Sequence, residues 1–577
     1  MKKKIRQLFH TDSVSRANSL ILTLYLWFIL GTSLFLYTLS LSRLLFFVLL
    51  VVLLFVLLAL SPILLNLTHK LQIPDIATLK EKNALRTRHE KRVWILFFFT
   101  ISLGIFLLYY LAYYPGGFSN DSVNQYEQSI SGRYNDWHPA LHTFLAFTLP
   151  LMVSGGNIAA ITLFQILYFA SVLTYAFYIL RCFSGKIFSV VSFLIVILNP
   201  ATGRMAMYPW KDVAFAITAL WMFTFVLQLV MTRGLWLHAP LHMILFAVVW
   251  ACTTIFRHNA VLLTAPLLIG VLLYGFTCHT QKSQKNIPSD HFSPLQPDSK
   301  KAANTPAQSD TCAHKETSGR QKIASLLTCL LSILIFFFIK GPVYTALGVE
   351  KPGGRQLETM GLPLTIICDV RTDDPSALDN ETKGFTDRLA DDEVWDTYTL
   401  GSFGGIKWKS HYDLIDDVPA SEILRMTTRC FFISPKVSVA AVIRLTDMVY
   451  TVSQGIDWAI DTPMVWPNKI GHTGAGNKIM AEGLEKYFSF TLSLPRILFY
   501  YIGIINLLVM ICLLAFHKWK EFESWRRFFV VVPLFTYNFG TMLLLTNNDY
   551  RLFYYSFLIA PLLLFILLVP HHGTEKN

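Results

Sequence analysis

Long apolar runs separated by short polar loops are the feature of this sequence that most restricts its fold. A helix that crosses about 30 Å of hydrocarbon needs about 20 apolar residues, because each residue adds about 1.5 Å. The runs that approach this length are 18–39, 44–65, 93–114, 157–180, 187–203, 212–232, 236–256, 260–277, 324–342, 495–516, 527–546 and 551–570. Only 15% of the 577 residues are charged, against roughly 25% in soluble domains. The sequence therefore predicts an all-α polytopic membrane protein with about 12 transmembrane helices, which excludes a cytosolic enzyme, a secreted disulfide scaffold and a DNA-binding protein.

The basic residues predict which side of the membrane each loop occupies. The formal net charge of +12 lies largely in loops and termini, so it is interpreted as a topology signal and not as nucleic-acid binding. The shorter run 139–153 decides the topology, because every later loop changes side if this run crosses. If it lies on the membrane without crossing, the basic loop 67–92 and the basic segment 278–323 both fall on the cytoplasmic side. We therefore expect a run that does not cross, with cytoplasmic N- and C-termini.

The spans divide the chain into regions of different character. The predicted regions are 1–92 (two spans and a basic cytoplasmic loop), 93–277 (a transmembrane core), 278–323 (a disordered cytoplasmic linker), 324–342 (one span), 343–494 (an extracytoplasmic domain) and 495–577 (C-terminal transmembrane helices). The linker is predicted from its polar composition, which cannot bury a core. The domain at 343–494, between spans nine and ten, mixes polar and apolar residues and is long enough to fold. It contains Cys368 and Cys430, which leaves a disulfide between them open.

Unusual polar residues gather at the predicted outer ends of the spans. The first outer loop contains Asn120 and Asp121, and helical spacing places Asp121 and Gln125 on one face. His138 precedes Pro139, which is typical of the first position of a helix. Taken alone, Asp121 has an ordinary explanation as an acid that the dipole favours at a helix start.

Later outer loops add further charges. They contribute Lys211, Asp212, Arg257, His258, Asp549 and Arg551. Each has a plain structural explanation as an ion pair, a cap or a contact with a lipid headgroup. Together they suggest more, because a carboxylate can act as a general base on a hydroxyl. Guanidinium and imidazolium groups can hold a phosphate leaving group. This set of groups suits sugar transfer from a lipid-phosphate donor whose tail stays in the bilayer.

The order of these residues resembles that of a known enzyme family. Asp121-x4-Tyr126 is followed by His138-Pro139, an apolar run that ends in glycine, a basic cytoplasmic turn, and then Pro200, Tyr208 and Asp212. This order is similar to that of the GT-C glycosyltransferases, in particular the branch of protein O-mannosyltransferases and aminoarabinose transferases. In layout, with Glu358 in the outer domain and Asp549-Tyr550-Arg551 near the end, the chain also resembles an uncharacterised bacterial multi-pass family catalogued as a domain of unknown function.

The resemblance implies a GT-C-like fold in the bacterial plasma membrane and an inverting transfer from a polyprenyl-phosphate sugar. It places the catalytic Asp at Asp121 and a second acidic residue at Asp212. Where the family has an Asp-Glu pair this chain has Asp121-Ser122, Ala140 replaces a second proline, and no Asp-x-Asp motif follows. The sequence therefore predicts no metal ligands and no certain cofactor, and leaves open whether a divalent metal takes part.

The predicted function is sugar transfer from a polyprenyl-phosphate donor to an extracytoplasmic acceptor, with membrane lipid as a partner and no nucleic acid. Asp121 is expected to be the general base, and Arg257 and His258 to hold the donor phosphate. The remaining candidate substrate-binding residues are Asn120, Gln125, His138, Lys211, Asp212, Glu358, Asp549 and Arg551. A transporter or flippase of a lipid-linked or small substrate is the alternative, although such proteins place ionisable residues near the bilayer midplane. A non-catalytic envelope assembly protein also stays open.

Overall fold

The computed structural model describes residues 16–38, 42–71, 82–85, 87–277, 310–351, 359–407, 409–451, 473–493, 501–518 and 522–569. Within these residues the elements are helices, and the one extended pairing is an isolated bridge between Asn135 and Glu350. Eight helices are long and apolar enough to cross a membrane, or up to ten candidates if each of two bent helix pairs is one span. This agrees with a polytopic helical membrane protein, but length and composition do not support the predicted count of twelve.

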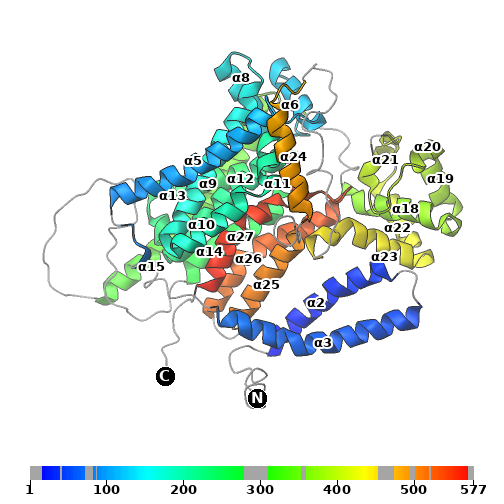
Figure 1. Cartoon of the computed structure of the whole chain (residues 1–577), viewed down its shortest axis with the longest axis horizontal. Helices are drawn as coiled ribbons and strands as arrows, with labels where there is room; N and C mark the ends of the chain where they lie inside the picture. The colour runs from blue at the N-terminus through cyan, green and yellow to red at the C-terminus, as the bar shows by residue number, and fades with distance from the viewer. Residues whose placement is uncertain are drawn as a thin grey trace.

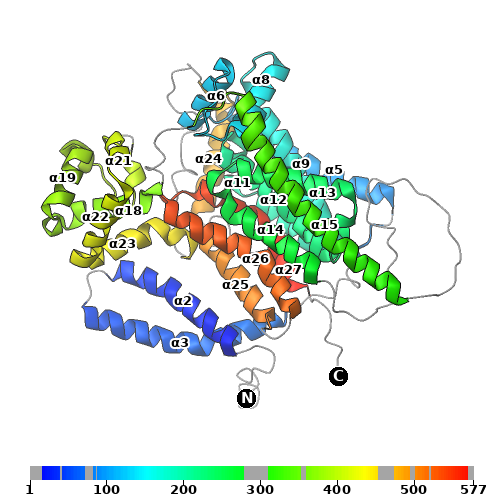
Figure 2. The same cartoon turned by 180° about the vertical axis from the view of Figure 1, so that it is seen from behind.

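The eight long helices coincide with eight of the predicted spans. They are α2 (Arg16–Tyr37), α3 (Arg43–His69), α5 (Arg88–Ala112), α9 (Ala159–Ser184), α12 (Lys211–Met231), α14 (Val261–Thr277), α15 (Asp310–Phe338) and α26 (Phe522–Thr541). α15 extends along the back of the bundle (Figure 2). It begins at Asp310, so residues 310–323 lie in a helix and not in the predicted linker, whose earlier part lies outside the described residues.

The other four predicted spans are bent or short. Span 187–203 is bent by 57° between α10 (Lys186–Ile197) and α11 (Pro200–Met207). The bend arises because the Asn199 side chain caps α11 and Pro200, which has no backbone N–H to donate, begins it. The three short helices are α13 (Pro240–Ile255), α25 (Ile502–Phe516) and α27 (Tyr554–Leu568). Residues 495–500 of the predicted span 495–516 lie outside the described residues.

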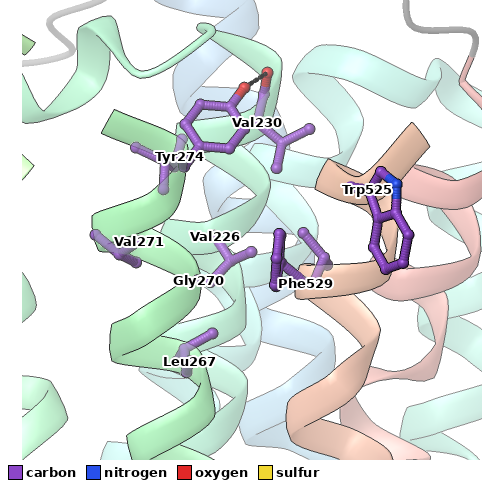
Figure 3. A pocket seen from close by; sticks show the side chains of 10 residues that line it. Val226, Val230, Leu267, Gly270, Val271, Tyr274, Trp525 and Phe529 are labelled. Atoms are coloured by element: carbon purple, nitrogen blue, oxygen red, sulfur yellow. Dashed lines mark hydrogen bonds between the residues drawn. The ribbon is translucent and has the colours of Figure 1, made fainter. Parts of the chain in front are cut away.

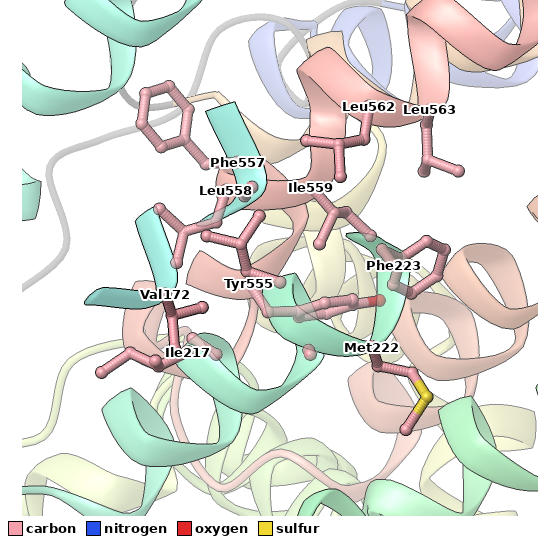
Figure 4. Packing of buried hydrophobic residues seen from close by; sticks show 14 of the residues in the cluster. Val172, Ile217, Met222, Phe223, Tyr555, Phe557, Leu558, Ile559, Leu562 and Leu563 are labelled. Atoms are coloured by element: carbon pink, nitrogen blue, oxygen red, sulfur yellow. The ribbon is translucent and has the colours of Figure 1, made fainter. Parts of the chain in front are cut away.

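Helix α12 forms the centre of the bundle. It is apolar on every side and almost entirely buried, as expected for a helix with neighbours all round. α9, α13 and α27 pack against it. In Figure 4, Ile217 and Phe223 of α12 lie among Val172 of α9 and Leu558 of α27, and all four are buried. Because the start of α12 is fixed on several sides, Lys211 and Asp212 have a defined position.

The hairpin α2–α3 lies to one side of this bundle, against α25 (Figure 1). Its outward side chains are apolar, and Phe47 and Phe55 of α3 are 63% and 67% exposed. Exposed apolar side chains of this kind are suited to contact with lipid.

Three short helices cover one end of the bundle. They are α6 (Asn120–Ser131), α7 (Ala140–Thr143) and α8 (Leu149–Ser154), the last two joined by a π-helical turn. The apolar helix Ala140–Ser154 formed by α7, that turn and α8 corresponds to the run 139–153 and is shorter than the eight candidate spans. Ser119 precedes α6 at the position where a serine often caps a helix, but its hydroxyl makes no capping bond.

Residues 359–451 form a helical unit beside the bundle, which we call the α18–α23 unit (Figure 1). Its main helices are α18 (Gly361–Asp373), α19 (Asn380–Leu389), α22 (Ala420–Ile433) and α23 (Pro435–Thr446). It has its own apolar core, which includes Leu364, Phe385 and Ile423. Cys368 and Cys430 are both free and buried, so the disulfide considered from the sequence is not formed.

Helix α24 (Lys478–Ser493), at the end of the predicted domain 343–494, packs along α5 of the bundle. It is tied there by Glu485, whose carboxylate accepts hydrogen bonds from Tyr113 and Arg204, each at 2.6 Å.

The segment after α26 connects the α18–α23 unit to the bundle. The backbone N–H of Gly404 donates to the carbonyl of Thr546 at 2.6 Å, and the Ser402 hydroxyl donates to Asn547 at 2.8 Å. The Asn548 amide donates to the Asp447 carboxylate at 2.6 Å. Three consecutive residues are thus bonded to the unit immediately before Asp549.

Candidate functional site

Charged side chains from four segments distant in sequence meet at one end of the bundle. We call this group the charge cluster; it consists of Asp121, Lys211, Asp212, Arg257, Asp549 and Arg551. α6, the start of α12, the turn before α14 and the 3₁₀ turn Tyr550–Leu552 supply them. All six were candidates from the sequence, and the structure brings them together.

Arg551 is the centre of the charge cluster. Its guanidinium lies 2.6 Å from the carboxylate of Asp549, 3.2 Å from that of Asp121 and 3.8 Å from that of Asp212. Asp549 also accepts a bond from the backbone N–H of Arg551 at 3.0 Å, which fixes the turn. Burial opposes charge on Arg551, but the three carboxylates outweigh it and raise its pKa further. Arg551 therefore stays cationic and fixes the positions of the three carboxylates relative to one another.

Arg257 is the second arginine of the charge cluster and pairs with Asp212. Its Nε donates to the Asn259 side chain at 2.6 Å, and Asn259 in turn donates to Thr541 of α26. The side chain of Asp212 is almost fully buried. A carboxylate this buried is costly unless paired, so Arg257 and Arg551 together explain how an ionised Asp212 is accommodated at the start of α12.

Asp121 is the one carboxylate of the cluster that solvent reaches: its side chain is 36% exposed, against 2% for Asp212 and 6% for Asp549. Burial tends to raise its pKa, but His138, Arg551 and Lys211 outweigh this effect and lower the pKa to about 2. Burial of Asp549 raises the pKa of that carboxyl. Asp121 is therefore ionised at neutral pH and accessible to a ligand.

Lys211 and His138 carry polar atoms that have few or no hydrogen bonds to the described part of the chain. The ammonium of Lys211 makes one hydrogen bond within the described residues, to the carbonyl of Trp137 at 3.4 Å. His138 is 3% exposed, and its Nδ1 is buried without a partner in the part of the chain that the structure describes. Burial, followed by repulsion from Lys211, lowers the pKa of His138 to about 3, so its ring is neutral. A buried polar atom without a partner is costly, which favours a ligand here.

Trp210 is a part of the site that sequence analysis did not identify. The guanidinium of Arg551 lies 5.0 Å from the centre of its ring, and its indole N–H donates to Ser119 at 2.7 Å. Tyr208 stacks on the same ring at 4.0 Å. Gly117 is required beneath Tyr208, because a Cβ there would come within 2.6 Å of the tyrosine ring. In the sequence Trp210 is indistinguishable from an ordinary interfacial tryptophan.

A second ion pair lies beside the charge cluster. Lys340, in the π-helical turn Ile339–Val343 after α15, binds Asp136 at 2.7 Å, and the Nε2 of His258 donates to the carbonyl of Asp136 at 2.9 Å. His258 thus belongs to this neighbouring pair, while Arg257 belongs to the cluster. Lys340 was not predicted, although a lysine at the end of an apolar run is a usable signal.

Two other candidates have roles outside the charge cluster. Gln125 is buried and its side-chain oxygen accepts from Thr143 and binds His142, so it attaches α6 to α7. Asn120, the first residue of α6, is exposed and makes no hydrogen bond with a described side chain. Glu358 lies outside the described residues.

The described residues contain no group of three His, Cys, Asp or Glu side chains arranged to hold a metal ion. A small apolar pocket lies at the other end of α12, between α12, α14 and α26 (Figure 3). Its lining is apolar and includes Val226, Leu267 and Trp525, so it is separate from the charge cluster.

Comparisons with protein-family models, with curated proteins and with solved structures find no match to this chain.

Proposed function

We propose that this chain is a membrane glycosyltransferase that moves a sugar, with inversion, from a polyprenyl-phosphate donor to an acceptor outside the cytoplasm. The observation that supports this most is the position of Asp121, an accessible carboxylate in contact with Arg551 at 3.2 Å and near the ammonium of Lys211. This reaction requires a base for the acceptor hydroxyl and cations that stabilise the departing phosphate, and the two lie side by side here.

In the proposed step the acceptor hydroxyl oxygen forms a bond to the anomeric carbon of the sugar. The bond between that carbon and the phosphate oxygen breaks, and the phosphate leaves with the electron pair. The hydroxyl proton passes to Asp121. Because the pKa of Asp121 is about 2, the carboxylate is a weak base, and it takes the proton only as the hydroxyl becomes acidic during bond formation.

The residues that we assign to the donor phosphate differ from Arg257 and His258, which the sequence suggested for it. Arg257 and Arg551 are held by carboxylates of the cluster, whereas Lys211 has donors to spare and His138 has an unused ring nitrogen within the described residues. We therefore assign the phosphate to Lys211 and His138. Asp212 and Asp549 are positioning residues that hold the two arginines.

The location of the charges favours an enzyme over the transporter or flippase alternative. Lys211 and Asp212 begin α12 and Arg257 precedes α14, so these charges lie at helix ends. A transport pathway is expected to carry ionisable groups near the midplane of the bilayer.

The test is a transfer assay with purified protein in nanodiscs and a panel of labelled polyprenyl-phosphate sugars. Wild type is compared with Asp121→Asn and with Glu381→Gln, a matched carboxylate-to-amide change in the α18–α23 unit. Product or donor hydrolysis in wild type and Glu381→Gln, lost in Asp121→Asn, supports the proposal. Equal turnover by Asp121→Asn contradicts the role of Asp121. Flux of a lipid-linked sugar across liposomes without transfer favours the transporter, and neither activity favours an assembly protein.

A further inference from the structure

The bend between α22 and α23 has an exposed apolar surface that the proposed function does not use. Phe432 is 83% exposed and Ile433 52% exposed, both directly before the bend. Leu424 and Val439, one on each of the two helices, are also exposed. Two large exposed apolar side chains next to each other at the corner of a folded unit, with further exposed apolar groups along both helices, indicate a contact surface.

The composition of the two helices indicates what that surface contacts. Ala420–Ile433 and Pro435–Val449 together are apolar enough to count as one membrane span. They are bent by 118° at the break, where Ser434 ends the first helix and Pro435 begins the second. A pair bent this sharply cannot cross a bilayer as one rod. It can enter one leaflet and return, or lie in the interface.

The position of α23 relative to α2 places the pair at the depth of the membrane. The Asn18 side chain of α2 donates to the carbonyls of Leu514 and His517 at the end of α25, which fixes one end of α2. Ten residues further along α2, about 15 Å at the usual helical rise, the Phe28 ring lies 4.9 Å from that of Tyr450. Tyr450 directly follows the turn that ends the bent pair.

Helix α2 continues past this contact as far as Tyr37 through apolar sequence, and it packs against α23. A helix that crosses the membrane is expected to keep its apolar side chains within the hydrocarbon. The part of α2 beside α23 is therefore within a leaflet, and so is the level at which α23 lies.

The charges on α22 are compatible with this position. Arg429 is paired with Asp379 at 2.8 Å and with Glu381 at 2.6 Å, and Arg425 is paired with Glu381. The two arginines of α22 are thus matched by acids from the α18–α23 unit. The bend itself presents Phe432, Ile433 and the exposed Lys436, and the long side chain of a lysine can keep its ammonium at the headgroups while its stem lies among apolar groups.

We propose that the bend between α22 and α23 inserts into the leaflet on the side of the charge cluster, with Phe432 and Ile433 among the lipid acyl chains. The partner is the lipid bilayer itself. The α18–α23 unit is then attached to the membrane by this bend as well as by its connections to the bundle.

The test places an environment-sensitive fluorescent amino acid at position 432 of the full chain in phosphatidylcholine nanodiscs. Emission is compared in lipid with and without bromine on the acyl chains, and with and without aqueous iodide. Brominated lipid is expected to reduce emission at least twofold, while iodide has little effect. A probe at Phe55, on the exposed face of α3, is the lipid control, and a probe at Glu393, exposed in α20 (Asp392–Trp395), is the solvent control.

Quenching by iodide as strong as at position 393 overturns the proposal, because the bend then lies in water. Protection from both quenchers also overturns it, because protein, such as a second copy of the chain, then covers the bend. If the variant at 432 does not yield folded protein, the same measurement at Ile433 decides, since that side chain is also exposed.

Discussion

The guanidinium of Arg551 lies 3.2 Å from the carboxylate of Asp121, although the two residues are 430 positions apart in the chain. This contact joins the first short helix after α5 to the turn before the last helix. It is also the contact through which the buried acids Asp212 and Asp549 influence Asp121, because Arg551 lies within 4 Å of all three carboxylates.

The low pKa of Asp121 predicts how transfer depends on pH. Since the pKa falls from 3.8 to about 2 on folding, the carboxylate is ionised throughout the range from pH 5 to pH 8. We expect kcat/KM to show no acid limb in this range. An enzyme with a histidine base of ordinary pKa near 6.5 would instead lose activity below that pH. An acid limb of kcat/KM near pH 6.5 in wild type therefore contradicts the assignment of Asp121 as base.

The same shift has a consequence for stability. A lowered pKa means that ionised Asp121 stabilises the folded protein above about pH 4, and this contribution is lost as the pH falls toward 2. Asp121→Asn is expected to abolish this part of the acid dependence of melting temperature.

Arg551→Gln is expected to destabilise the protein strongly. Removing the guanidinium leaves Asp212 and Asp549 buried with fewer partners, and breaking a buried pair in this way costs about 3–5 kcal/mol. Thermal melting in nanodiscs measures the effect. The double variant Arg551→Gln/Asp549→Asn should melt above the single variant, because one of the uncompensated charges is gone.

Arg425→Gln is the control for that prediction. Arg425 also pairs with a carboxylate, Glu381, but both side chains are more than 40% exposed. Exposed ion pairs contribute about 0–1 kcal/mol, so the melting temperature should barely change. Equal losses in the two arginine variants would mean that Arg551 is not the centre of a buried cluster.

Lys211→Met is expected to weaken donor binding without unfolding the protein. Hydrogen bonds to charged groups contribute about 1.5–3 kcal/mol, which corresponds to a rise in the KM for the donor of roughly 10- to 100-fold. The fold should tolerate the change, because within the described residues the ammonium makes a single hydrogen bond, of 3.4 Å, to the carbonyl of Trp137. Lys383→Met, at an exposed position of α19, should leave the donor KM unchanged, and a similar rise in both variants would indicate a general electrostatic effect.

Gly117→Ala is expected to destabilise the site by steric conflict. A Cβ at this position would lie 2.6 Å from the ring of Tyr208, which is stacked on Trp210. Overpacking of this kind costs about 1–3 kcal/mol. Gly104→Ala in α5 has nothing within 4 Å of its new Cβ, so helix propensity predicts a gain of up to about 1 kcal/mol there. Melting of both variants gives the comparison.

Much of the helical framework follows from the sequence. The run 212–232 predicts α12 within one residue at each end, because an apolar run is unambiguous in length and has charges at its start. The helices in spans 236–256 and 551–570 are shorter than predicted. Span 187–203 is bent, because Asn199 and Pro200 favour a new helix start within an apolar run.

The site was predictable as a set of residues but not as a set of contacts. Asp121, Asp212 and Arg551 are conspicuous because charges are rare in an apolar chain. Their pairing is set by how distant helices pack, and no local pattern encodes that. Gln125 shows the same limit. The sequence placed it on the same helix as Asp121, four residues further on, but could not show that its side chain binds His142 and not a substrate.

The three residues Thr546, Asn547 and Asn548, each bonded to the α18–α23 unit, connect that unit mechanically to the charge cluster. The next residue is Asp549, which holds Arg551. An antibody fragment that grips α18 and α19 and tilts the unit would pull on this short stretch of backbone and shift the guanidinium away from Asp121. Such a binder would inhibit the proposed transfer without occupying the charge cluster itself.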